Sequence, residues 1–70
     1  MVAMKAPLPG TIVQVLVKEG QKVDKNEAVL VIEAMKMEND IVAPEAGTVK
    51  AIHVAQGDSV PVDALLVEIE

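Results

Sequence analysis

"APLPGTI", residues 6–12, decides the fold of this chain because a closely related stretch follows it. "APEAGTV" occupies residues 43–49, an offset of 37 positions. Both stretches begin with Ala-Pro and carry Gly-Thr at the same spacing. A recurring pattern of this kind indicates a chain built from two copies of one structural unit.

The correspondence extends outward from these stretches without a gap. The same offset places Gly20 on Gly57 and Ile32-Glu33 on Ile69-Glu70. The shared glycines and apolar positions are those that set backbone shape, so we interpret the similarity as an internal duplication.

The duplication organises the chain as a single domain over residues 1–70. Its repeat halves are residues 1–33 and 38–70, and residues 34–37 join them. The joining segment has no counterpart in the other half. We expect it to form a hairpin tip at one end of the domain, while the two termini lie together at the opposite end.

Each half has the composition of β-structure, since stiff β-branched Val and Ile dominate it. Short turn signals recur every several residues, as in "PLPG", "KEG", "PEAG" and "AQG". The shared apolar positions interrupt strict alternation, which predicts a bulge near Val13-Gln14 and another near Lys50-Ala51. We predict a flattened all-β sandwich in which the two units bury their apolar faces against each other about a pseudo-two-fold axis.

Composition excludes several classes of function. The 70 residues include no cysteine and no aromatic residue, 51% are hydrophobic, and the formal charge is −5. Without a basic cluster or a stacking aromatic, nucleic-acid binding is not expected. No apolar run approaches the roughly 18 residues of a membrane helix, and no secretory leader is evident. We expect a monomeric domain in the cytoplasm and no metal site.

"EAMKMEN", residues 33–39, breaks a local rule of turn chemistry. If Glu33 and Glu38 end the flanking strands, Met35 and Lys36 are the central residues of a two-residue hairpin turn. Such turns need positive φ and favour Asn-Gly or Asp-Gly, so these two residues imply strain of about 1–3 kcal/mol. Departures of this kind concentrate at functional sites.

Two readings of this segment are open from its residues alone. Lys36 is an ordinary solvated lysine and the two methionines fill gaps at the end of the core, or the segment presents Lys36 for another enzyme to modify. A protruding tip beside two acids is poorly suited to a Schiff-base or general-base lysine. Elsewhere, the lone His53, on a strand in our reading, and Ser59 do not form a catalytic set, so no catalytic residue is expected.

At this motif the sequence resembles the biotin carboxyl carrier (biotinyl) domains of biotin-dependent carboxylases, decarboxylases and transcarboxylases. Their attachment signature, Ala-Met-Lys-Met, is present here as Ala34-Met35-Lys36-Met37. The resemblance covers essentially the whole chain and includes "VKEGQKV", residues 17–23, besides the two stretches quoted first.

The resemblance implies a barrel-sandwich hybrid fold with the target lysine on a hairpin. Because the two halves match without a gap, the chain leaves no room for the thumb that is inserted in some acetyl-CoA carboxylase carriers. It also implies a non-catalytic carrier in the cytoplasm, free or within a membrane-associated decarboxylase complex. Biotin protein ligase would join biotin to the Lys36 amine, with Ala34, Met35 and Met37 as the recognition motif. The attached biotin would then move a carboxyl group between a biotin carboxylase site and a carboxyltransferase site.

Three alternatives remain beside this interpretation. A lipoyl carrier domain of a 2-oxo acid dehydrogenase-type complex shares the fold and also modifies a hairpin lysine, but typically carries Asp-Lys-Ala at the tip. An unmodified structural module of the same fold would need no modified lysine. An independent enzyme is the least supported alternative, since no catalytic set is apparent.

Overall fold

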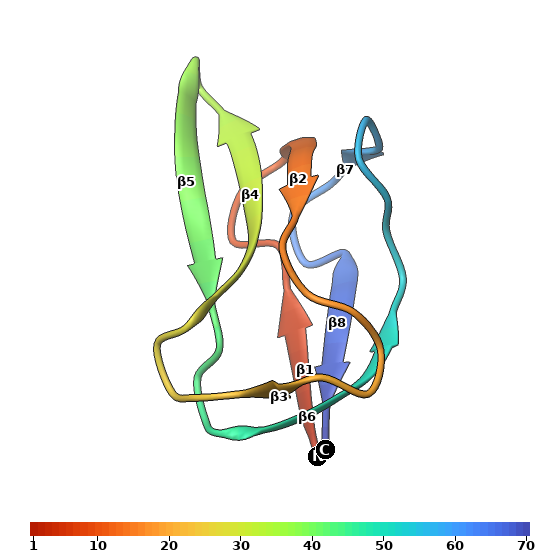
Figure 1. Cartoon of the computed structure of the whole chain (residues 1–70). Coiled ribbons are helices and arrows are strands. Elements are labelled where there is room, and N and C mark those ends of the chain that lie inside the picture. Colours follow the sequence, from red (N-terminus) through yellow and green to blue (C-terminus); the bar gives the residue numbers. More distant parts are fainter.

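The computed structural model describes all 70 residues and consists of strands joined by turns (Figure 1). The eight strands are β1 (Val2–Lys5), β2 (Gly10–Val15), β3 (Lys22–Val23), β4 (Ala28–Ala34), β5 (Met37–Val42), β6 (Gly47–Ile52), β7 (Ser59–Val60) and β8 (Leu65–Ile69). No helix in the structure has the length and apolar character needed to cross a bilayer.

The strands form two four-stranded antiparallel sheets, as the predicted all-β sandwich requires. Their orders are β1-β8-β6-β3 and β5-β4-β2-β7. Each sheet takes two strands from before the Met35-Lys36 turn and two from after it. The expectation that each repeat half forms its own layer is therefore wrong, because strands of the two halves pair with each other within both sheets.

Both predicted bulges are confirmed. The β2–β4 ladder shifts register between Ile12 and Gln14, which leaves Val13 without a partner. The β6–β8 ladder shifts in the same way between Val49 and Ala51. An extra residue on one strand increases the local twist and bends the strand.

Backbone geometry recurs at the 37-residue spacing seen in the sequence. Gly20 and Gly57 have φ of 89° and 94°, and Asn26 and Asp63 have φ of 69° and 66°. Glycine accepts a left-handed conformation without steric cost, and Asn and Asp are the other residue types that commonly adopt it. The matching turns thus use residues suited to their backbone.

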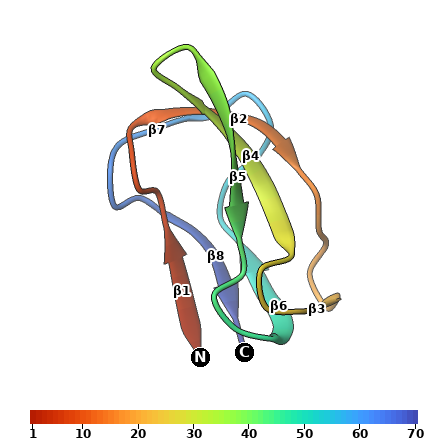
Figure 2. The ribbon, with the colours of Figure 1, turned by 90° about the vertical axis from the view of Figure 1, so that its left-hand side faces the viewer.

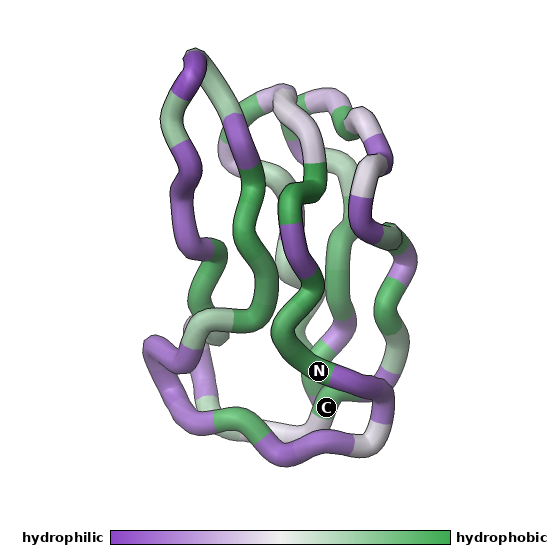
Figure 3. The backbone as a smooth tube through the Cα atoms, turned by 45° about the horizontal axis from the view of Figure 1, so that its top comes forward, coloured by the Kyte–Doolittle hydropathy of each residue, from purple (hydrophilic) through white to green (hydrophobic).

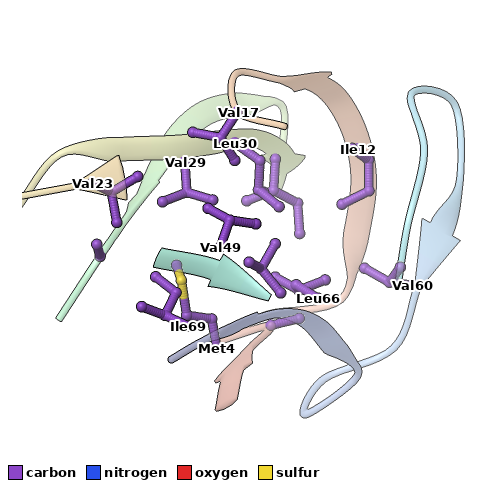
Figure 4. Close-up of a cluster of buried hydrophobic side chains, with 14 residues drawn as sticks. Met4, Ile12, Val17, Val23, Val29, Leu30, Val49, Val60, Leu66 and Ile69 are labelled. Carbon is purple, nitrogen blue, oxygen red and sulfur yellow. The ribbon is translucent and has the colours of Figure 1, made fainter. Parts of the chain in front are cut away.

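The core is aliphatic and lies between the two sheets (Figure 4). Apolar residues lie along β2, β4 and β8, whereas most residues of β5 are hydrophilic (Figure 3). The buried cluster comprises Met4, Ala6, Ile12, Val17, Val23, Val29, Leu30, Ile32, Ala43, Val49, Val60, Leu66, Val67 and Ile69. Removal of these side chains from water stabilises the fold by an amount proportional to the apolar area buried.

The domain is elongated, with extents of 30 × 18 × 17 Å. The β4–β5 hairpin tip lies at one pole, and both termini lie at the other, where β1 pairs with β8 (Figures 1 and 2). The tip is therefore presented away from the chain ends, as expected from the sequence.

Candidate functional site at the β4–β5 hairpin

The β4–β5 ladder continues to the outermost end of the hairpin. Glu33 pairs with Glu38, and Ala34 pairs with Met37 as the last pair. The strands thus extend one residue further on each side than Glu33 and Glu38, the strand ends assumed from the sequence. Two residues remain for the loop.

Those two loop residues, Met35 and Lys36, are both left-handed. Their φ angles are 54° and 64°. A type I′ turn requires positive φ at both central positions, so the predicted turn geometry is confirmed. Left-handed backbone costs roughly 1–2 kcal/mol for a residue with a Cβ. They are the only residues of positive φ that lack a counterpart 37 positions away.

Burial separates the members of the Ala-Met-Lys-Met segment. Met35 and Met37 are 84% and 66% exposed, whereas Ala34 is 4% exposed. Lys36 is exposed as well. The two methionines are therefore not gap-fillers of the core, and large apolar side chains this exposed mark a surface available for contact.

Acidic and amide side chains lie on both strands of the hairpin close to its tip. Glu33 and Glu38 lie directly opposite each other, an arrangement of like charges that destabilises a ladder. The Asn39 amide donates a hydrogen bond from Nδ2 to the Met37 carbonyl oxygen (3.2 Å). We did not predict this role for Asn39 from the sequence, although Asn commonly bonds to backbone close by in the chain.

His53 and Ser59 lie outside the β4–β5 hairpin, and they are not on the same strand. His53 follows β6, one residue beyond the strand in which the sequence placed it, and its Nε2 lies 2.8 Å from Glu68 Oε1. Ser59 is in β7, paired with Thr11. The His53–Glu68 contact is a hydrogen bond between the two side chains, and no pocket and no cluster of three or more metal-ligating side chains is found.

The tip can therefore present a primary amine to another protein. Lys36 is exposed, takes part in no ion pair, and is held at the outermost point of a short hairpin. An amide-linked acyl group needs an accessible amine and a site open on all sides. This arrangement fits the covalent attachment of such a group.

Comparison with known proteins identifies the family. The family model described as "biotin-requiring enzyme" matches residues 2–69. The chain is 58% identical over 57 residues to the biotin carboxyl carrier protein of Streptococcus mutans, and 46% identical over 67 residues to the mitochondrial propionyl-CoA carboxylase alpha chain of Homo sapiens. These matches cover 81% and 96% of this chain.

Solved structures agree with this grouping. The urea carboxylase of Kluyveromyces lactis matches 99% of the chain with a TM-score of 0.93 and 28% identity, over 6% of its own length. The lipoyl domain of the 2-oxoglutarate dehydrogenase complex from Azotobacter vinelandii matches all of the chain and 96% of its own length, with a TM-score of 0.86 and 26% identity.

The sequence relatives distinguish between these two kinds of domain, since the fold is common to both. The chain spans 44% of the streptococcal protein and 9% of the human one. The first is named a biotin carboxyl carrier protein and the second is the alpha chain of a carboxylase, and the family model for biotin-requiring enzymes spans residues 2–69. The chain therefore belongs to the biotin-requiring enzyme family, as a biotin carboxyl carrier domain, a non-catalytic domain whose cofactor is covalent biotin.

Proposed function

We propose that Lys36 is the residue that carries biotin, with Ala34, Met35 and Met37 as the motif that surrounds it. The observation that carries this proposal is the hairpin tip. Two left-handed residues without a counterpart in the other half place one exposed lysine at the pole opposite the termini. A less strained turn was available to the sequence, so the strain is retained for the lysine.

Biotin protein ligase is the proposed partner for attachment. Lys36 Nζ would attack the carboxyl carbon of biotin, activated as a mixed anhydride with a nucleotide phosphate. The C–N bond forms, the phosphate leaves with the bonding electrons, and the amine proton passes to a base. Exposure of the tip allows the ligase to surround the lysine.

After attachment, the domain contributes by positioning biotin at the partner sites. When bound, biotin supplies a ureido nitrogen that takes up and releases a carboxyl group. The lysine side chain and the biotin side chain together reach on the order of 12–15 Å from the backbone. The proposed carrier thus moves between biotin carboxylase and carboxyltransferase partners, and tethering raises the local concentration of biotin at each.

Intact-mass measurement after co-expression with a biotin protein ligase tests the attachment. We expect one biotinyl adduct on the wild-type domain and none on Lys36→Arg, because a guanidinium remains protonated and does not form the amide. Lys25→Arg, a lysine change near the opposite pole, serves as the control and should label fully. Labelled Lys36→Arg, or an unlabelled wild type, would overturn the assignment.

The lipoyl domain shares this fold, so lipoylation of the same lysine is the competing outcome of the attachment experiment. Exposure of the same domain to a lipoate ligase distinguishes the two, because biotinyl and lipoyl adducts differ in mass. Lipoylation without biotinylation would establish this alternative. Absence of both adducts would favour an unmodified structural module.

A further inference from the structure

The two repeat halves are held together by four ladders and joined by one short turn. β1 pairs with β8, β2 with β7, β3 with β6 and β4 with β5, and each of these pairs takes one strand from each half. Along the chain, the halves are connected through the Met35-Lys36 turn. A half that separates from its own chain therefore finds the same ladders in the other half of a second copy.

The connecting turn is the strained part of this arrangement. Met35 and Lys36 are both left-handed, with φ of 54° and 64°. The other residues of positive φ are Asn, Asp or Gly, the types that suit it. The strain disappears if residues 35 and 36 become extended, which the monomer forbids because the chain reverses there. A short hinge under strain favours exchange of an element between two copies.

The hairpin ladder continues across two copies without a change of register. Ala34 pairs with Met37 as the last pair before the turn. With the turn opened, β4 and β5 of one copy form a single strand over residues 28–42, which pairs antiparallel with the same strand of a second copy. One further step of this register places Met35 of each copy opposite Lys36 of the other. The result has two-fold symmetry, because each copy gives and receives the same half.

The shape of the domain leaves room for two copies joined in this way. The β4–β5 tip projects beyond the rest of the domain, and both termini lie at the other pole (Figures 1 and 2). Two domains joined tip to tip keep their bodies apart, and the two extended residues of the opened turn add roughly 7 Å between them. The termini then lie at the outer ends of the dimer.

Charge at the junction also favours the exchanged ladder. Glu33 and Glu38 face each other across the hairpin, and Lys36 makes no ion pair in the monomer. Side chains of an extended strand alternate between faces, so Lys36 shares a face with Glu38 of its own strand and Glu33 of the second copy. Diagonal neighbours on one face lie about 7–8 Å apart, within reach of long side chains. The ammonium then offsets the repulsion between the two carboxylates.

We propose that this chain forms a domain-swapped dimer with a second copy of itself, with Met35-Lys36 as the hinge. Each domain of the dimer consists of residues 1–34 of one copy and residues 37–70 of the other. Both sheets, the bulges and the core are the same as in the monomer, because every ladder within a domain is remade. The two forms differ at the hinge, where both residues of each copy leave the left-handed region.

The swapped dimer removes Lys36 from its place at a hairpin tip. The lysine lies instead in the middle of a ladder that continues on both sides, so a ligase cannot surround it from the end. This consequence rests on the proposed function. Attached biotin has the opposite effect on the equilibrium, because the amide removes the Lys36 charge that offsets the carboxylates at the junction.

A cysteine pair across β1 and β8 distinguishes swapping from ordinary association. Ala3 lies directly opposite Glu68, at a separation that a disulfide spans. Ala3→Cys with Glu68→Cys introduces the only thiols, since the chain has no cysteine. Monomer and dimer peaks are separated under reducing conditions and then oxidised. On a denaturing, non-reducing gel, the first should run as a single chain and the second as a covalent dimer. A dimer peak that runs as single chains would overturn the swap.

Hinge variants test whether strain drives the exchange. Each chain is refolded from urea at a series of concentrations, and its dimerisation constant is measured by size exclusion with light scattering. Met35→Asn with Lys36→Gly suits the turn and should lower the constant roughly tenfold, whereas Met35→Val, β-branched at a left-handed position, should raise it roughly tenfold. Equal constants for the wild type and both variants would overturn the proposal.

Asn26→Val is the matched control for these variants. It places the same misfit at another left-handed position, φ 69°, in a turn that lies inside one half. Monomer and dimer both contain this turn, so the stability should fall while the dimerisation constant stays unchanged. A rise equal to that of Met35→Val would show that any loss of stability drives association, and would overturn the hinge.

Ligase labelling separates this inference from the proposed function. Wild-type monomer and dimer peaks are each incubated with biotin protein ligase and read by intact mass, and a second size-exclusion run checks that each has kept its state. The monomer should label fully while the dimer remains largely unlabelled. A dimer that labels as fast as the monomer would overturn the shielding of Lys36. A monomer that takes no biotin would overturn the attachment at Lys36, and the gel and the hinge variants would still decide the swap.

Discussion

Gly10 packs directly against the backbone carbonyl of Glu33, so that a Cβ at this position would overlap its oxygen. The same relationship recurs at Gly47, where a Cβ would lie 2.7 Å from the Glu70 carbonyl oxygen and 2.6 Å from Ile69 Cγ2. Both positions require glycine because a neighbouring strand approaches closely there. Backbone atoms of that strand do not move aside as flexible side chains do.

Gly10→Ala and Gly47→Ala should each destabilise the domain by about 1–3 kcal/mol, the usual cost of overpacking. Urea denaturation monitored by far-UV circular dichroism measures the change in the free energy of unfolding. Thr11→Ala, at an exposed position in β2, serves as the control. A stability within about 0.5 kcal/mol of the wild type for either glycine variant would contradict this explanation.

Replacement of Met35-Lys36 by Asn-Gly should stabilise the domain by about 1–3 kcal/mol, because these residues suit positive φ at both turn positions. The same variant should accept no biotin. Thermal unfolding and intact mass are the two measurements. Met35→Asn, which keeps the lysine, should show part of the stabilisation. A less stable Asn-Gly variant would show that the native turn is not strained.

Met35→Leu and Met37→Leu should change the free energy of unfolding by less than about 0.5 kcal/mol, since both side chains are largely exposed. We expect their effect in the rate of ligase labelling or of carboxyl transfer instead. Calorimetry beside a ligase assay tests this order. If stability falls while labelling and transfer rates stay constant, the methionines have a structural role.

Ile32→Ala and Ile69→Ala should each destabilise the domain by about 2–5 kcal/mol, because both side chains are buried at equivalent positions of β4 and β8. A domain this small has little stability to spare, so either variant is expected to be partly unfolded near 37 °C. Val62→Ala is the exposed control and should remain near the wild type. Chemical denaturation compares all three, and a large difference between the two isoleucine variants would argue against equivalent packing in the two sheets.

The tip was predictable from local chemistry. Two-residue hairpin turns need positive φ, and the sequence supplied Met35 and Lys36 where Asn-Gly is usual, so the strained turn followed from residue type and spacing. The bulge at Val13 followed in the same way from the interruption of apolar alternation.

The sequence by itself determined the strand composition, the two bulges and the identity of the turn that carries Lys36, because each depends on residues within a few positions of one another. Only the tertiary structure decided which strands share a sheet. Alternation assigns a side chain to a face but does not choose a partner, and β4 pairs with both β2 and β5 while β1 pairs with β8. Those long-range pairings bring Gly10 against the backbone of Glu33 near the hairpin tip and Gly47 against the backbone of Glu70 at the C-terminus.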